Sequence, residues 1–128
     1  MSRARAARLL VVAPDPRVRA AVAGFAEPAG HRVDGLDGDR ATDPAAALAA
    51  AANADLALVD WSLVDGAAGH LGVMLKRGRP DLGLVALVPM GTDRPEPAGW
   101  DMVAPLPLAG DTMVRMLDRW QEDRHDRD

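Results

Sequence analysis

The segment 54–60 constrains the fold of this chain more than any other part of its sequence. Its residues are ADLALVD, so four consecutive aliphatic side chains lie between Asp55 and Asp60. A short, unbroken aliphatic run between polar residues is typical of a strand buried on both faces, as in a parallel sheet covered by helices. We therefore predict a strand that ends at Asp60. In open α/β sheets ligands bind at the carboxyl edge, so Asp60 is a candidate site residue.

Four further segments have strand character. Two are unbroken aliphatic runs like the first, at 9–13 (LLVVA) and 84–88 (LVALV, stopped by Pro89). The segment 102–106 contains Pro105, which cannot donate a ladder hydrogen bond and therefore indicates an exposed edge strand. The segment 31–36 is short and weakly apolar, and at best it forms the other edge.

Helical patterns alternate with these strands. After Pro14, Asp15 and Pro16 the spacing predicts a helix with one apolar stripe, formed by Val18, Ala21, Val22 and Phe25 and ended by Pro28 and Gly30. Thr42 or Asp43 caps an alanine-rich helix that begins at Pro44 and runs to about residue 52. A shorter stripe comprises Leu71, Met74 and Leu75.

The last helix is the most regular. We expect Asp111 to cap it, and its apolar positions repeat at helical spacing at Met113, Met116, Leu117 and Trp120. The segment 90–99 should hold a helix if the alternation continued. Pro95 and Pro97 forbid regular helix across it, so we expect a loop or one turn, that is, a shortened or broken fourth helix.

This order of elements predicts an α/β fold. Right-handed crossovers favour a doubly wound, flavodoxin-like, five-stranded parallel sheet with strand order 2-1-3-4-5. The order reverses between the first and third strands. Residues 13–15 and Asp60 should therefore converge on one crevice.

Composition limits the possible functions. The 128 residues predict one domain, 1–128, with flexible tails at 1–8 and 121–128. With 15 basic and 19 acidic residues the net charge is −4, so we expect no direct binding to nucleic acid or to a membrane. No apolar run approaches the roughly 20 residues of a membrane span, and cysteine is absent, so we expect a cytoplasmic protein.

Five segments, in order and at matching spacing, resemble the receiver domain of bacterial response regulators, which are two-component signalling proteins. The resemblance extends over residues 8–120. The matching pieces are LLVVAPDPRVR (9–19), EPAGHRV (27–33), ADLALVD (54–60), RPDLGLVALV (79–88) and LPL (106–108).

The resemblance implies that Asp60 is the phospho-acceptor of a phosphorelay. In the family this carboxylate attacks phosphorus, while Mg²⁺ bound by it and by acids at the end of the first strand neutralises the phosphoryl oxygens. A lysine at the end of the fifth strand pairs with the acyl phosphate. A hydroxyl at the end of the fourth strand follows the new charge and relays the switch.

The remaining family positions depart from this pattern. The acid pair matches Ala13 and Pro14, with Asp15 one residue late and more typical of a turn before Pro16. The hydroxyl, lysine and aromatic switch positions match Val88, Leu106 and Val103. The single lysine, Lys76, lies elsewhere, in the third helix; the Asp-Gly of the family is present slightly early, at 65–66, and its loop proline matches Val64.

We therefore expect a degenerate receiver, or pseudo-receiver. It would be a signalling module, not an enzyme, that binds a protein partner or forms a homodimer without phosphorylation and without a cofactor. The alternative is a working phospho-accepting receiver in which Asp15 and Asp60 hold Mg²⁺ and an arginine replaces the lysine. A third possibility is an unrelated flavodoxin-like binder of a small ligand, which an open apolar crevice beside Asp60 would favour.

Overall fold

The computed structural model describes residues 6–36, 43–60, 71–89 and 100–127. Its centre is an all-parallel sheet in which five strands are ordered β2-β1-β3-β4-β5. The strands are β1 (Arg8–Val12), β2 (Arg32–Leu36), β3 (Leu56–Asp60), β4 (Gly83–Pro89) and β5 (Met102–Leu106). The predicted flavodoxin-like fold and strand order are confirmed.

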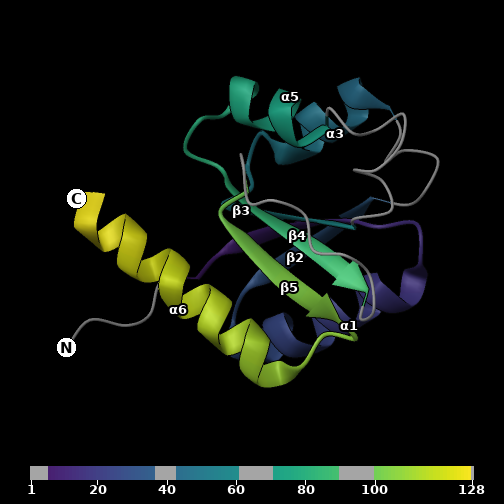
Figure 1. The fold of residues 1–128 in the computed structure, drawn as a ribbon, viewed down its shortest axis with the longest axis vertical. Helices are drawn as coiled ribbons and strands as arrows, with labels where there is room; N and C mark the ends of the chain where they lie inside the picture. The colour runs from purple at the N-terminus through teal and green to yellow at the C-terminus, as the bar shows by residue number, and fades with distance from the viewer. Residues whose placement is uncertain (1–5, 37–42, 61–70, 90–99, 128) are drawn as a thin grey trace.

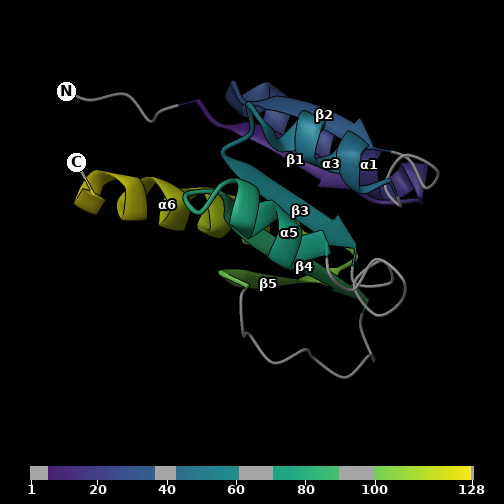
Figure 2. The same ribbon diagram turned by 90° about the horizontal axis from the view of Figure 1, so that it is seen from above.

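Helices cover both faces of the sheet. They are α1 (Pro16–Ala26), α3 (Pro44–Ala51), α5 (Leu71–Gly78) and α6 (Gly110–Arg127), with a short 3-10 helix η1 (Glu27–Ala29) following α1. Figure 1 shows α3 and α5 above the sheet and α1 and α6 below it. Figure 2, which looks from above, shows α3 and α5 lying over the strands.

Two hydrophobic cores follow from the alternation of side chains along the strands. In β1, Leu9 and Val11 enter a core with α1 and α6, whereas Leu10 and Val12 enter a second core with α3 and α5. All five residues of β3 are buried. A strand covered on both faces favours apolar side chains at successive positions, which explains the aliphatic run 56–59 before Asp60.

Side-chain caps begin two of the helices. Asp15 accepts a hydrogen bond from the backbone N–H of Arg17, and Asp43 accepts one from Ala45. Each satisfies a backbone donor that the first helical turn leaves without an intrahelical partner. Gly30, at φ 95°, ends η1 in the left-handed region, where glycine has no steric cost. Thr42, the other predicted cap, lies outside the described residues.

The helix α6 begins two residues earlier than a cap at Asp111 predicts. The helix begins at Gly110, so Asp111 lies inside its first turn and accepts from the N–H of Thr112 instead of capping from outside. An acidic residue there still interacts favourably with the positive end of the helix dipole. The predicted apolar stripe of α6 is confirmed, because Met113, Met116, Leu117 and Trp120 are all buried.

The expected stripe of α1 was wrong at one position. Phe25 is 42% exposed, and Ala26 is buried in its place. Val22 and Ala26 are four residues apart and both face the sheet, whereas the Phe25 ring lies beside Gly110 at the start of α6. The aromatic side chain therefore lies at the rim of the α1/α6 core and not in it.

Both expected tails overlap regular structure. Arg8 is the first residue of β1, and α6 continues through residues 121–127. Among the described residues, no helix is long and apolar enough to cross a membrane. The predicted broken fourth helix at 90–99 lies outside the described residues.

Candidate functional site

Asp60 ends β3 at the carboxyl edge of the sheet, as the sequence predicted. Its side chain is 8% exposed, and among the described residues it is the single charged side chain that is buried. Val12 of β1 pairs with Val59 in the parallel register, so the next residues, Ala13 and Asp60, stand at the same level on neighbouring strands. Such strands lie about 4.8 Å apart. The fold therefore brings the β1–α1 loop and Asp60 to one place.

The β1–α1 loop offers few side chains that could bind a metal ion. Ala13 is fully buried and Pro14 is exposed, and neither carries a ligating group. Asp15 is engaged in starting α1: it accepts the Arg17 N–H at 2.9 Å and forms an ion pair with the Arg17 guanidinium at 3.2 Å. The hydrogen bonds from the side chain and then the backbone of Arg17 lower the pKa of Asp15. The geometry of Asp15 is that of a helix cap.

Arg19 makes contacts at this edge that sequence analysis did not predict. Its Nη1 donates to the carbonyl oxygen of Ala13 at 2.6 Å and to that of Pro14 at 3.2 Å. A fixed cation therefore lies against the loop in which the family carries its acid pair. No sequence signal distinguishes Arg19 from the exposed Arg17, because both are arginines in the first turn of one helix.

The switch positions at the carboxyl ends of β4 and β5 are apolar. Val88, near the end of β4, is 3% exposed and pairs with Pro105 of β5. Leu106 ends β5, is half-buried, and packs against the α1/α6 core. Its peptide bond to Pro107 is cis. Neither side chain can bond a phosphoryl oxygen.

Val103 lies in β5, which is an edge strand of the sheet. It is half-buried and lines a groove between β5 and α6 with a volume of about 470 Å³. The groove is lined by Met102, Val103, Ala104, Pro105, Thr112, Arg115, Met116 and Arg119. This groove opens at the edge strand and not beside Asp60, so it does not provide the crevice that the small-ligand hypothesis requires.

The chain's one lysine lies near the amino ends of the strands, opposite the carboxyl ends where Asp60 stands. Lys76, near the end of α5, forms an ion pair at 3.0 Å with Asp101, which immediately precedes β5. Asp101 also accepts the N–H of Leu84 at 2.8 Å. The amino ends of β4 and β5 are at this edge, whereas Asp60 stands at the carboxyl edge. Lys76 thus has a structural partner and is remote from the phospho-acceptor position.

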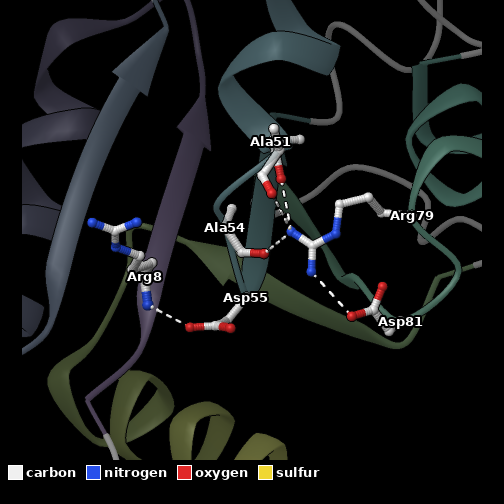
Figure 3. Close-up of polar contacts among 7 residues, drawn as sticks. Arg8, Ala51, Ala54, Asp55, Arg79 and Asp81 are labelled. Carbon is white, nitrogen blue, oxygen red and sulfur yellow. Dashed lines mark hydrogen bonds and ion pairs between the residues drawn. The ribbon is translucent and has the colours of Figure 1, made fainter.

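Other charged side chains also stabilise the amino edge (Figure 3). Asp55 accepts the N–H of Arg8 at 2.9 Å and so aligns β1 with β3. Arg79 donates to the carbonyl oxygens of Ala51, at 2.9 Å, and of Ala54, and pairs with Asp81 at 3.1 Å. These charged side chains have partners within the fold, so their presence does not indicate a ligand-binding site.

Several predicted features of the site lie outside the described residues. They are the loop position Val64 and the Asp-Gly at 65–66, which follow Asp60. Within the described segments, no group of three or more His, Asp or Glu side chains is placed to hold a metal ion.

No protein-family model matches the sequence, and no curated protein matches it. Solved structures do. NtrX from Brucella abortus is similar with a TM-score of 0.77 and 26% identity over 93% of this chain, which spans 27% of that protein. A receiver domain protein (CheY-like) from Methanospirillum hungatei has a TM-score of 0.77 and 19% identity, covering 97% of this chain and all of that one.

A third similar structure is described as a pilus assembly-related protein from Burkholderia pseudomallei, with a TM-score of 0.75 and 22% identity, covering 95% of this chain and 94% of that one. These similarities agree with the strand order and the two helical layers. The chain has the fold of the response-regulator receiver domains.

Proposed function

We propose that this chain is a degenerate receiver that works as a signalling interaction module without phosphorylation. The receiver fold supports a role in two-component signalling. The observation that carries the finer proposal is the position of Lys76. The one lysine of the chain is paired with Asp101 at the amino edge, so no lysine can pair with an acyl phosphate on Asp60.

The electrostatics at Asp60 support the same proposal. A phosphoryl group adds negative charge to a carboxylate, and the charge must be neutralised by cations or by hydrogen-bond donors. Each missing charge-assisted hydrogen bond removes about 1.5 to 3 kcal/mol of stabilisation. Val88 and Leu106 supply neither charge nor a hydroxyl. A phosphorylated Asp60 would therefore lack two of the contacts that hold the modified state in the family.

We further propose that the output is binding to a protein partner or to a second copy of the chain, in the cytoplasm. The domain would have no enzymatic activity and require no cofactor. The second candidate remains a working phospho-receiver. It is favoured by one observation, the burial of Asp60 at the carboxyl end of β3, where a phospho-acceptor belongs.

The deciding experiment is the intact mass of the protein after incubation with a small phosphodonor and Mg²⁺. Asp60→Asn is the matched variant, because it keeps the shape of the side chain and removes the nucleophile. A receiver domain with a complete acid pair and lysine is the positive control. We expect no phosphoryl adduct on the wild type or the variant. An adduct on the wild type that D60N abolishes would overturn the proposal and establish the phosphorelay function.

A further inference from the structure

The helix α3 is apolar on all sides although one of its sides faces solvent. Its sequence is PAAALAAA, so none of its side chains carries a charge or a hydrogen-bonding group. Ala47 and Ala51 are buried in the core with α5, whereas a stripe on the opposite side of the helix is exposed. The exposed residues are Ala45, Leu48, Ala49 and, directly after the helix, Ala52. A surface helix ordinarily carries polar side chains toward water, and a helix that is apolar all round is ordinarily covered.

The exposed apolar surface continues onto α5, which packs beside α3 in the same helical layer (Figure 1). Leu48 lies against α5, because a Cβ atom built at Gly78 would be 3.1 Å from Cδ2 of Leu48. Val73 of α5 is exposed as well. Among the described residues the other large apolar side chains that are exposed, Phe25 and Val114, belong to the opposite layer. Contiguous exposed apolar surface of this kind marks a site of protein interaction.

The exposed stripe of α3 is complementary to itself. Positions 45, 48, 49 and 52 lie symmetrically about the midpoint between Leu48 and Ala49. Two antiparallel copies of α3, related by a two-fold axis at this midpoint, would place Leu48 against Ala49 of the second copy and Ala45 against Ala52 of the second copy. A two-fold interface requires one surface that matches itself in this way. The stripe therefore fits a second copy of the chain.

The charges at the two ends of α3 favour the same arrangement. Asp43 caps the amino end and is exposed, whereas Arg79 is bound to the carbonyl oxygens of Ala51 and Ala54 at the carboxyl end. Antiparallel packing about the same midpoint brings position 43 of one copy beside position 54 of the other. Asp43 would then approach Arg79 of the second copy, so opposite charges meet at both ends of the helix pair. Parallel packing would bring like charges together.

We propose that the outer side of α3, with the adjoining side of α5, is a two-fold interface between copies of this chain in which α3 packs antiparallel to its counterpart and Leu48 lies at the centre. This inference rests on the proposed function, for which it names a second copy as the partner. Eight helical residues span only about 12 Å. An interface built around so short a helix is small, and small interfaces form weak, transient complexes. The dimer therefore depends on protein concentration.

The first test is sedimentation equilibrium of the full chain over a wide range of protein concentration, with Kd expected between about 1 μM and 1 mM. Ala49→Glu keeps helix propensity at an exposed position and should raise Kd at least about tenfold, because it would bury a charge against Leu48 of the second copy. Val114→Glu is the matched control. It places the same side chain at an exposed apolar position of α6 and should leave Kd unchanged. Far-UV circular dichroism checks that both variants fold.

The second test determines the orientation of the two helices. The chain has no cysteine, so single cysteines can be introduced at exposed positions of α3. A mixture of A45C and A52C, treated with a short thiol cross-linker, should give several times more cross-linked dimer than either variant alone. Antiparallel packing is the reason, because it brings position 45 of one copy to position 52 of the other.

The outcomes separate this inference from the proposed function. A monomer at every concentration would overturn the interface and leave the degenerate receiver standing. A dimer that V114E weakens and A49E leaves intact would place the interface on α6 and would also overturn the inference. So would more cross-linking of A45C alone than of the mixture, since it indicates parallel helices. The proposed function fails by a separate measurement, a phosphoryl adduct on Asp60, which neither of these tests detects.

Discussion

Arg17 and Arg19 stand two residues apart on α1 and have different roles. The Arg17 side chain is 91% exposed and pairs with the cap Asp15, whereas Arg19 is half-buried and bonds to the carbonyls of the preceding loop. Successive helical residues point about 100° apart, so a spacing of two separates these side chains onto different sides of the helix. The position on the helix, and not the residue type, gives each arginine its partner.

Asp15→Asn should remove a pH-dependent part of the stability. The folded pKa of Asp15 is lowered by Arg17, so its charge stabilises the fold above the unfolded pKa, and that contribution is lost as pH falls through the folded pKa. Asparagine caps helices about as well as aspartate, so D15N isolates the charge. The free energy of unfolding, measured by urea denaturation, should differ most from wild type at neutral pH and converge in acid.

The matched control is Asp43→Asn, which alters the cap of α3. Among the described contacts the Asp43 carboxylate accepts only the backbone N–H of Ala45, so D43N alters a helix cap that has no arginine partner there. A constant difference between D15N and wild type across the acid range would contradict the role of the Arg17 charge.

The helix α3 depends on an element distant in sequence. It has eight residues, seven of them alanine or proline, so its own side chains bury little apolar area. Arg79, in the turn between α5 and β4, donates to the carbonyls of Ala51, Ala52 and Ala54 (Figure 3). A cation at the carboxyl end of a helix also interacts favourably with the helix dipole. One arginine thus anchors the end of α3 to the sheet.

Arg79→Ala should destabilise the domain by about 1 to 3 kcal/mol, because it leaves the carbonyl of Ala51 in α3 and those of Ala52 and Ala54 after it without their charged donor. The measurement is urea denaturation, with amide hydrogen exchange showing the loss of protection concentrated in α3. Arg77→Ala is the control, since Arg77 is an exposed arginine at the end of α5. Equal effects of R79A and R77A would contradict the anchoring role.

At the scale of the whole molecule, the sheet is stable because helices cover both faces. The α1/α6 core takes side chains from β1, β3, β4 and β5, and α6 contributes Met113, Met116, Leu117 and Trp120 to it. Trp120 is 5% exposed although it lies beyond the middle of an 18-residue helix. The last helix and α1 therefore cover one face of the sheet together.

Trp120→Ala should cost about 3 to 5 kcal/mol, the usual penalty for removing a large buried aromatic side chain. A domain of this size is stable by only about 5 to 15 kcal/mol, so the variant should unfold at a much lower urea concentration. Val114→Ala, at a position of α6 that is 58% exposed, is the control and should change stability little. A W120A midpoint close to that of V114A would show that α6 is not part of the cooperative core.

Much of the fold could be predicted from the sequence. The aliphatic runs at 9–13, 56–59 and 84–88 have the composition that only a doubly covered strand requires, and Pro105 marks an edge because it cannot donate in a ladder. The alternation of these runs with helical stripes leaves few topologies, and the observed order is the favoured one. The position of Asp60 at the carboxyl edge follows from the same pattern.

The partners of the charged residues were decided by the tertiary structure alone. Arg19 of α1 bonds to the loop that precedes the helix, Arg79 bonds to the end of α3, and Lys76 pairs with Asp101 across 25 positions of sequence. Long side chains can reach several neighbours, and the packing of elements selects one of them. The architecture could be predicted because the burial pattern of each segment is visible in neighbouring residues of the sequence. Only the folded arrangement determined the electrostatics of the site, because charge interactions depend on distances between elements far apart in the chain.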